Sequence, residues 1–382
     1  MSISILIPTF NRAHLLGETI DSVLGQTRQV DEILVIDDGS SDDTAGVVRS
    51  YEGALTYLRQ ENAGKSAALN TGLSRAKGDL IWICDDDDIL AETACQQLVD
   101  QLESDPSLDF ACGRHDDFTV DPVNGKKTYK PAGIDFASSS DAIFSDLLEG
   151  CHIFQPGLIV RKSVYDSVGP FREDLLRSQD YEMILRIARG HRGVMVDDIV
   201  FHYREHPGTR GPAQSRFDWS ERYEVWRSFA EQIFRPLLAD LDDAELLPES
   251  LPDVPTEPNA LRRARCLKRA TVYSRHGLWR EAAEIWHHAA SEFSAGLTEF
   301  ERQLVRRSTE VQYLQLFSDA QLKKSLWSLG RSGQLGYELK WNINRSLRWR
   351  IRQALRRGDV GELTKFVQYF YSTSSMNFVR SD

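Results

Sequence analysis

The stretch IWICDDDDIL, residues 81–90, joins an apolar run directly to four consecutive aspartates. The apolar residues around it, 79–84, predict a short buried strand. Like charges a few Å apart repel by about 1 kcal/mol in water, and by several kcal/mol at a lower effective dielectric. A repulsive run at the end of a buried strand therefore indicates that a positive group is held there.

The bulk composition bounds the class of protein. The chain has 382 residues, enough for two domains with sizeable cores, and 41% hydrophobic with 27% charged residues is ordinary for a globular protein. A net charge of −11 argues against a general nucleic-acid binder. Five cysteines without a CxxC pair predict free thiols in a reducing cytoplasm. No long apolar run or signal peptide is seen, so we expect a cytoplasmic protein.

The first hundred residues alternate between strand-like and helix-like segments. This alternation predicts a mostly parallel sheet covered by helices on both faces. Ligands of such sheets bind at the carboxyl ends of the strands. Three polar motifs follow predicted strands and should meet at that edge: IPTFN (7–11), DDGS (37–40) and DDDD (85–88).

The remainder of the chain has a different character. A strand and a helix are predicted within residues 157–169, and a further helix starts near residue 180. After REHPGTRGPAQ, residues 204–214, the pattern is almost entirely helical. We therefore expect an α/β domain over 1–212, which carries the polar motifs, and a helical region over 213–382.

The aspartate run is suited to a divalent cation. Alternate residues of an extended segment point the same way, so Asp85 and Asp87 should face one side, with Asp86 turned away and Asp88 beginning the next turn. Two carboxylates leave sites open on Mg²⁺ or Mn²⁺ for phosphate oxygens and water. A solvated acidic loop or a helix cap is the alternative. No GxGxxG or GxxxxGK[ST] motif is present, which argues against a nicotinamide Rossmann domain and a P-loop enzyme.

Four motifs in order resemble family 2 glycosyltransferases with the GT-A fold: SILIPTFNRAHLLGETIDSVLGQT, DEILVIDDGSSDDT, QENAGKSAALNTGLSRAKGD and LIWICDDDDIL. The resemblance covers residues 2–105 closely and continues loosely to about 210. It implies an α/β nucleotide-diphospho-sugar transferase fold, here with an α-helical C-terminal region. It also implies an inverting hexosyl- or N-acetylhexosaminyltransferase using a nucleotide-diphosphate sugar, with UDP-sugars the first expectation. The implied acceptor is a saccharide or lipid-linked glycan in surface polysaccharide or glycoconjugate synthesis.

The resemblance also implies which residues bind the donor. The residues implied to bind the base and ribose of the donor are Pro8, Thr9, Asn11, Arg12, Asp37 and Asp38. Nucleotide or phosphate contacts fall to Asn62, Gly64 and Lys65, unless Gly64 serves only a turn and Lys65 only a solvated face. The acidic triplet Asp85, Asp86 and Asp87 binds the donor and Mn²⁺ or Mg²⁺, with Asp87 and Asp85 as metal ligands.

The same resemblance places the chemistry on the segment RSQDYEMILRIA. Asp180 would be the general base that deprotonates the acceptor, and capping the helix is its alternative role. Gln179 stands where the family usually has Glu, which puts a charged contact by that neighbour in doubt. In FHYREHPGTR, Arg204 would face the diphosphate and His206 would be a third metal ligand or a diphosphate contact. A surface loop is the alternative for this segment.

The tail carries a separate signal. Residues 323–357 contain ten Lys or Arg and one acidic residue. Five apolar residues there recur at four-residue spacing, flanked by Trp341 and Trp349: Leu339, Ile343, Leu347, Ile351 and Leu355. This pattern predicts a helix lying on an anionic membrane, with peripheral contact at the inner face through 321–357. A helix packed on the catalytic domain, with its arginines paired there, and a self-associating helix in a homo-oligomer are equally open alternatives.

Two rival functions remain at this point. A non-catalytic or regulatory sugar-nucleotide-binding protein would use the same fold as a scaffold, and donor hydrolysis would distinguish it from an enzyme. A nucleotidyltransferase would need a Gly-rich loop bearing Arg or Lys after the first strand, and IPTFNRAH lacks such a loop. We expect no nucleic-acid partner.

Overall fold

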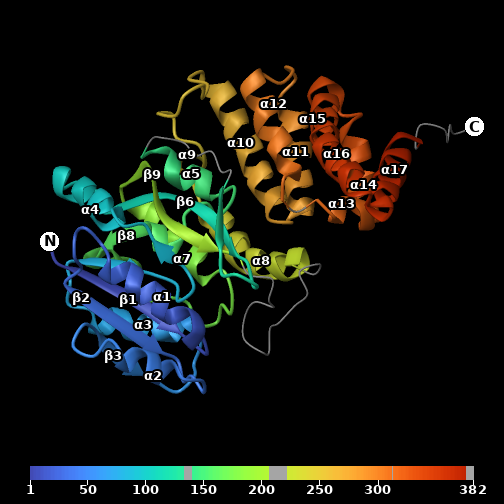
Figure 1. Cartoon of the computed structure of the whole chain (residues 1–382). Coiled ribbons are helices and arrows are strands. Elements are labelled where there is room, and N and C mark those ends of the chain that lie inside the picture. Colours follow the sequence, from blue (N-terminus) through green and yellow to red (C-terminus); the bar gives the residue numbers. More distant parts are fainter. Residues whose placement is uncertain (133–139, 206–221, 312, 376–382) are drawn as a thin grey trace, which may run out of the picture. The chain divides into compact units, whose positions relative to one another are not determined.

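The computed structural model describes residues 1–132, 140–205, 222–311 and 313–375. The chain divides into two compact units (Figure 1). The first comprises Met1–Leu147 and Cys151–Trp219, and the second comprises Leu148–Gly150 and Ser220–Asp382. The boundary expected at 212/213 falls in a stretch outside the described residues.

The first unit is built on one mixed sheet. Four parallel strands stand in the order β3-β2-β1-β4, namely β3 (Thr56–Arg59), β2 (Glu32–Asp37), β1 (Ile3–Thr9) and β4 (Leu80–Ile83). These four are the strands expected from the sequence. The sheet continues through β8 (Leu158–Arg161), β6 (Phe110–Val120), β9 (Gly193–Arg204) and β5 (Ile89–Leu90), with β7 (Lys127–Pro131) paired to β6. This second half is largely antiparallel: only β6 and β9 pair in parallel.

The parallel half follows from its apolar composition. All seven residues of β1 are buried, as are all four of β4, which is typical of strands covered on both faces. The connecting helices are α1 (Ala13–Leu24), α2 (Thr44–Arg49), α3 (Lys65–Arg75) and α4 (Ala94–Ser104). In α1, Leu16, Ile20 and Val23 are buried at helical spacing. The carboxyl ends of β1, β2 and β4 therefore open onto one edge of the unit.

The rest of the first unit carries short helices: α5 (Ala142–Leu147), the 3-10 helix η1 (Gln155–Gly157), α6 (Lys162–Val168) and α7 (Gln179–Gly190). Trp82 of β4 is fully buried, and its indole N–H donates to the Pro156 carbonyl at 2.8 Å. This bond ties η1 to the strand that carries the aspartates.

The second unit is helical. Its helices are α8 (Arg222–Asp240), α9 (Asp243–Leu246), α10 (Pro258–Arg275), α11 (Trp279–Glu292), α12 (Glu299–Arg306), the 3-10 helix η4 (Arg307–Thr309), α13 (Gln315–Ser318), α14 (Ala320–Leu329), α15 (Gly333–Ser346), α16 (Arg348–Arg357) and α17 (Val360–Ser375). Trp279, Trp286 and Phe366 lie in its core. Within this unit Glu149 accepts a hydrogen bond from Lys268 at 2.5 Å, and both side chains are buried. None of the described helices is long and apolar enough to span a bilayer.

The tail differs from the single helix expected. α15 ends at Ser346 and α16 begins at Arg348, and Leu339, Ile343 and Leu347 are buried in the core of the second unit. The expectation that all five apolar residues face a membrane is therefore wrong for these three. Ile351 is half-buried and Leu355 is 60% exposed.

Candidate active site

The loops after β1, β2 and β4 meet at the carboxyl edge of the sheet, as expected. The backbone N–H of Asp38 donates to the Thr9 carbonyl at 2.9 Å, and that of Asn11 donates to Ser40 Oγ at 2.9 Å. The Arg12 guanidinium donates to Asp87 Oδ2 at 2.6 Å. These contacts join the three motifs into one site.

The aspartate run folds as a turn and not as an extended segment. β4 ends at Ile83, and the backbone N–H of Asp88 donates to the Asp85 carbonyl at 3.3 Å. The alternation expected for Asp85–Asp88 is therefore wrong, because the chain reverses there. The side chains of Asp85 and Asp87 are 28% and 19% exposed, whereas Asp88 is buried.

Carboxylates crowd this turn. Burial and the neighbouring Asp87 raise the pKa of Asp86 to about 7, and the same two causes raise the pKa of Asp88 well above its usual range. Burial also raises the pKa of Asp85, although Lys65 offsets part of the effect. Burial and like charge together therefore disfavour full ionisation of the carboxyl groups in this turn.

Lys65 is the cation at the centre of the site. Its ammonium pairs with Asp85 Oδ1 from the first turn of α3. Burial would lower the pKa of Lys65, but the charges of Asp85 and Asp180 outweigh burial and raise it. Asp180 therefore lies close enough to Lys65 to affect its protonation, although the two are far apart in sequence.

Asp38 holds the loop that precedes Lys65. Its carboxylate is 3% exposed and accepts hydrogen bonds from Gln60 Nε2 at 2.8 Å and from the backbone N–H groups of Ala63 and Gly64 at 2.9 and 2.8 Å. The Asn62 side chain donates to the Asp38 carbonyl at 2.9 Å. These contacts position the loop, and the nucleotide contacts expected of Asp38 and Asn62 stay predictions.

Asp37 and Asn11 shape the turn after β2. Asp37 is fully buried and accepts hydrogen bonds from the Ser40 backbone at 2.7 Å and from the Tyr57 hydroxyl. Asn11 Oδ1 accepts from the Ser41 backbone N–H at 2.7 Å. Pro8 and Thr9 are buried at the end of β1.

Arg204 braces the aspartate turn from β9. Its backbone N–H donates to Asp88 Oδ1 at 2.9 Å, and its guanidinium donates to the Asp87 carbonyl at 2.7 Å and pairs with Glu18. The residue is 6% exposed, and the guanidinium lies 4.6 Å from the centre of the Phe118 ring. These contacts hold the turn in place, and the diphosphate contact suggested for Arg204 stays a prediction.

Asp180 is the second residue of α7 and not its cap. Ser178 precedes the helix with a left-handed backbone (φ 57°), and Asp180 Oδ1 accepts the backbone N–H of Tyr181 at 2.8 Å. The neighbouring carboxylates have partners: Glu182 pairs with Arg186, Asp174 with Arg172, and Glu173 accepts from Asn70. Gln179 is buried, and in the described part of the chain its Oε1 has no hydrogen-bond partner.

The proposed third metal ligand, His206, lies outside the described residues. Within them, no three His, Cys, Asp or Glu side chains are gathered so as to hold a metal ion. Sequence reasoning missed Glu18, which pairs with Arg204 and Lys127, and Tyr57, which fixes Asp37. Glu18 lies within the first motif quoted from the sequence, but its partners Arg204 and Lys127 are far away along the chain, and Tyr57 belongs to none of the motifs.

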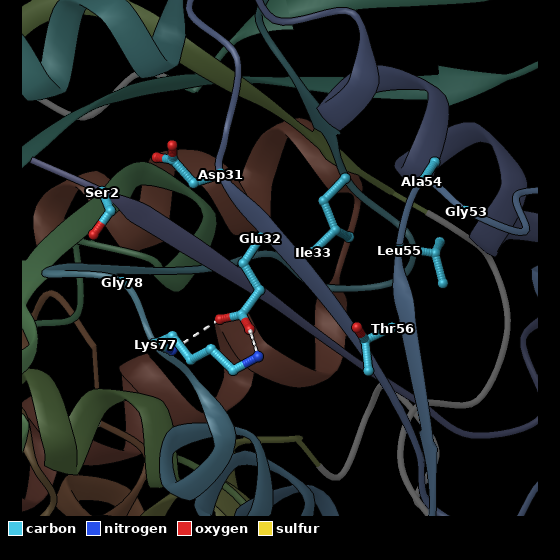
Figure 2. Close-up of a pocket in the computed structure, with 10 residues that line it drawn as sticks. All are labelled: Ser2, Asp31, Glu32, Ile33, Gly53, Ala54, Leu55, Thr56, Lys77 and Gly78. Atoms are coloured by element: carbon cyan, nitrogen blue, oxygen red, sulfur yellow. Dashed lines mark hydrogen bonds and ion pairs between the residues drawn. The ribbon is translucent and has the colours of Figure 1, made fainter.

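A hollow of about 510 Å³ lies at the opposite edge of the parallel strands (Figure 2). It is lined by the starts of β2 and β3 and by the approach to β4, including Glu32, Thr56 and Lys77. Glu32 accepts the Lys77 backbone N–H at 2.8 Å and lies 3.8 Å from the Lys77 ammonium. Ligands of parallel sheets bind at carboxyl ends, so this hollow is not the candidate active site.

Comparisons with known proteins agree with the geometry. Residues 4–169 match the model of glycosyl transferase family 2. An uncharacterized glycosyltransferase of Rickettsia prowazekii is 27% identical over 241 residues, 60% of this chain and 72% of its own. Glycosyltransferase GlyG of Streptococcus pneumoniae is 26% identical over 258 residues, 63% and 82% of the two chains.

Solved structures show the same fold. The structure of residues 1–349 of TarS from S. aureus with UDP-GlcNAc has a TM-score of 0.52 at 18% identity. It covers 94% of this chain and 92% of that one. The mixed sheet, the acidic turn after β4 and the match over 4–169 lead to one conclusion: the first unit is similar to glycosyl transferase family 2 and shares the fold of the solved TarS structure.

Proposed function

We propose that the protein is an inverting, metal-dependent glycosyltransferase that takes a sugar from a nucleotide-diphosphate donor. The observation that carries the proposal is the convergence of Asp180, Lys65 and the turn of Asp85 and Asp87 at one sheet edge. A general base, a cation for a diphosphate and a pair of metal-binding carboxylates are the parts that such a transfer needs.

Two cations and the first turn of a helix would bind the diphosphate of the donor. Lys65 is in the first turn of α3, whose free backbone N–H groups favour anions. Gly64 before it has a φ of 94°, and a side chain there would be strained although space is open. Arg12 stands across the turn on Asp87. A diphosphate that displaces these two cations from the aspartates would meet both of them. Because TarS was crystallised with UDP-GlcNAc, UDP-sugars are the first donors to test.

Asp85 and Asp87 would hold the divalent cation. Both are partly exposed, as is Asp86, and each faces a cation, Lys65 on Asp85 and Arg12 on Asp87. Two protein ligands leave room for diphosphate oxygens and water on Mn²⁺ or Mg²⁺. Bound there, the metal would stabilise the charge that develops on the leaving nucleoside diphosphate.

Asp180 would take the acceptor proton. Tyr181 occupies Oδ1, and no described residue hydrogen-bonds to Oδ2, which leaves that oxygen for a hydroxyl. The orphan Gln179 Oε1 could accept from the same acceptor and orient it, but an amide cannot take a proton. The acceptor would be a saccharide or lipid-linked glycan, as the resemblance implies.

Thermal unfolding with a panel of nucleotide sugars tests the proposal. A true donor with Mn²⁺ at a hundredfold its dissociation constant should add about 2.7 kcal/mol of stability. The same donor without metal, or Asp87→Ala with metal, should add little. Stabilisation that survives both changes would contradict the metal assignment, and stabilisation without any turnover would favour the non-catalytic binding protein.

A further inference from the structure

The last two helices of the second unit leave an unusual face in solvent. From Trp341 to Tyr371 every residue is described, and the exposed charged side chains are six cations against Asp359 alone: Arg345, Arg348, Arg352, Arg356, Arg357 and Lys365. Exposed apolar side chains are mixed among them: Trp341, Trp349, Leu355, Val360, Val367 and Tyr371. We call these exposed residues, which belong to the end of α15 and to α16 and α17, the basic-apolar face.

Helical spacing gathers the two kinds of side chain into rows. Arg348, Arg352 and Arg356 are four residues apart and share one side of α16, away from buried Ala354. Val360, Val367 and Tyr371 share one side of α17, opposite buried Tyr369. α16 and α17 pack on each other. Between them lies an apolar groove of about 660 Å³, lined by residues that include Ile351, Leu363 and Phe370.

The arginines of this face are not neutralised by carboxylates. Among the described residues no acidic side chain pairs with Arg345, Arg348, Arg352 or Arg356. Arg345 lies 4.8 Å from the Trp341 ring centre. Of the six cations, Arg357 has an acidic partner, Glu362. Within the described residues, these four arginines are therefore not occupied by acidic partners.

We propose that the basic-apolar face binds the surface of an anionic lipid membrane. Exposed arginines beside apolar and aromatic side chains match an interface with charged headgroups above acyl chains. A second copy of the chain fits less well, because two such faces would bring like charges together. The stripe of Leu339, Ile343 and Leu347 has no part in this binding, since those residues are in the core.

Vesicle co-sedimentation of the full chain tests the proposal. Vesicles of equal parts phosphatidylcholine and phosphatidylglycerol should retain the protein at about 0.1 M salt and release it at about 1 M, where the screening length falls from about 10 Å to about 3 Å. Pure phosphatidylcholine vesicles should retain little. Equal retention by neutral vesicles, or no retention by anionic ones at low salt, would overturn the proposal.

Charge placement supplies a matched control. The triple variant R348Q/R352Q/R356Q should bind anionic vesicles roughly a hundredfold more weakly, since each arginine near the surface contributes about 1 kcal/mol. The variant R262Q/R280Q/R302Q removes the same charge from two exposed positions and one half-buried position elsewhere in the unit and should bind as the wild type does. An equal loss of vesicle binding in both variants would show a general effect of net charge and would refute the proposal that this face binds the membrane.

The apolar row gives a second, independent test. V367S/Y371S changes two exposed side chains, so the fold should be kept, as circular dichroism can check. We expect at least tenfold weaker binding to anionic vesicles. If this variant instead abolishes a dimer seen by sedimentation velocity while vesicle binding is unchanged, the face is a contact between copies and the membrane proposal fails.

Discussion

Replacing Asp38 by Asn separates positioning from direct donor contact. The carboxylate accepts three hydrogen bonds through its two oxygens. An Asn side chain has one acceptor oxygen, and its NH2 group can only donate. Hydrogen bonds to a charged group contribute about 1.5–3 kcal/mol each. Ala63 is exposed and Gly64 partly exposed, so water replaces part of the loss. We therefore expect the free energy of unfolding to fall by only about 2 kcal/mol, with the damage concentrated in residues 60–64.

The consequence for function is indirect. A loosened loop no longer fixes the first turn of α3, so Lys65 loses its place beside Asp85, and donor affinity should fall about tenfold. Urea unfolding, hydrogen exchange of residues 60–64 and donor titration measure the three effects. Asp43→Asn, an exposed change of the same charge, is the control. Weaker donor binding with unchanged stability and exchange would show that Asp38 touches the donor itself and would refute this reasoning.

Three further predictions concern Lys65, Gly39 and His276. Lys65→Met should raise Mn²⁺ affinity, because the cation competing for Asp85 is gone, while nucleoside diphosphate binds at least tenfold more weakly; calorimetric titration measures both, and lower Mn²⁺ affinity would count against it. Gly39→Ala should destabilise by about 1–3 kcal/mol in urea unfolding, since φ is +81° and the new Cβ would lie 2.9 Å from the Asn62 nitrogen; an unchanged midpoint would be the contrary result. Burial lowers the pKa of His276 from 6.5 to about 3, so the unfolded chain takes up the proton first and stability falls as pH drops from about 6.5 toward 3, at about 1.4 kcal/mol per pH unit. Unfolding measured across that range should lose this slope in His276→Gln, and an identical slope in both proteins would refute it.

The parallel half of the fold was predictable because its signals are local. β1 and β4 are continuous apolar runs, and polar motifs follow them directly, so their meeting at one edge needs only the rule for parallel strands. The antiparallel half was not foreseen. Its strand order depends on pairings such as that of β4 with β8, which no spacing in the sequence records.

Within the site, the sequence predicted which residues belong to it more readily than which contacts each residue makes. Asp38 and Arg204 belong to recognisable motifs, but their partners decide what they do, and Glu18 stands 186 residues from Arg204. The tail shows the same limit. The four-residue spacing of Leu339, Ile343 and Leu347 indicated that they share one apolar helix face. It did not show that this face packs on other helices and not on lipid.

Turnover by Asp180→Asn tests the central claim most directly. With a donor identified by thermal stabilisation, the release of nucleoside diphosphate and the anomeric configuration of the product are followed by NMR. The account predicts a product of inverted configuration from the wild type. It predicts unchanged donor affinity and turnover lowered by about 10² to 10⁴ in the variant, because the amide keeps the shape of the side chain but cannot take the acceptor proton. Undiminished turnover in Asp180→Asn, or retention of configuration by the wild type, would contradict it.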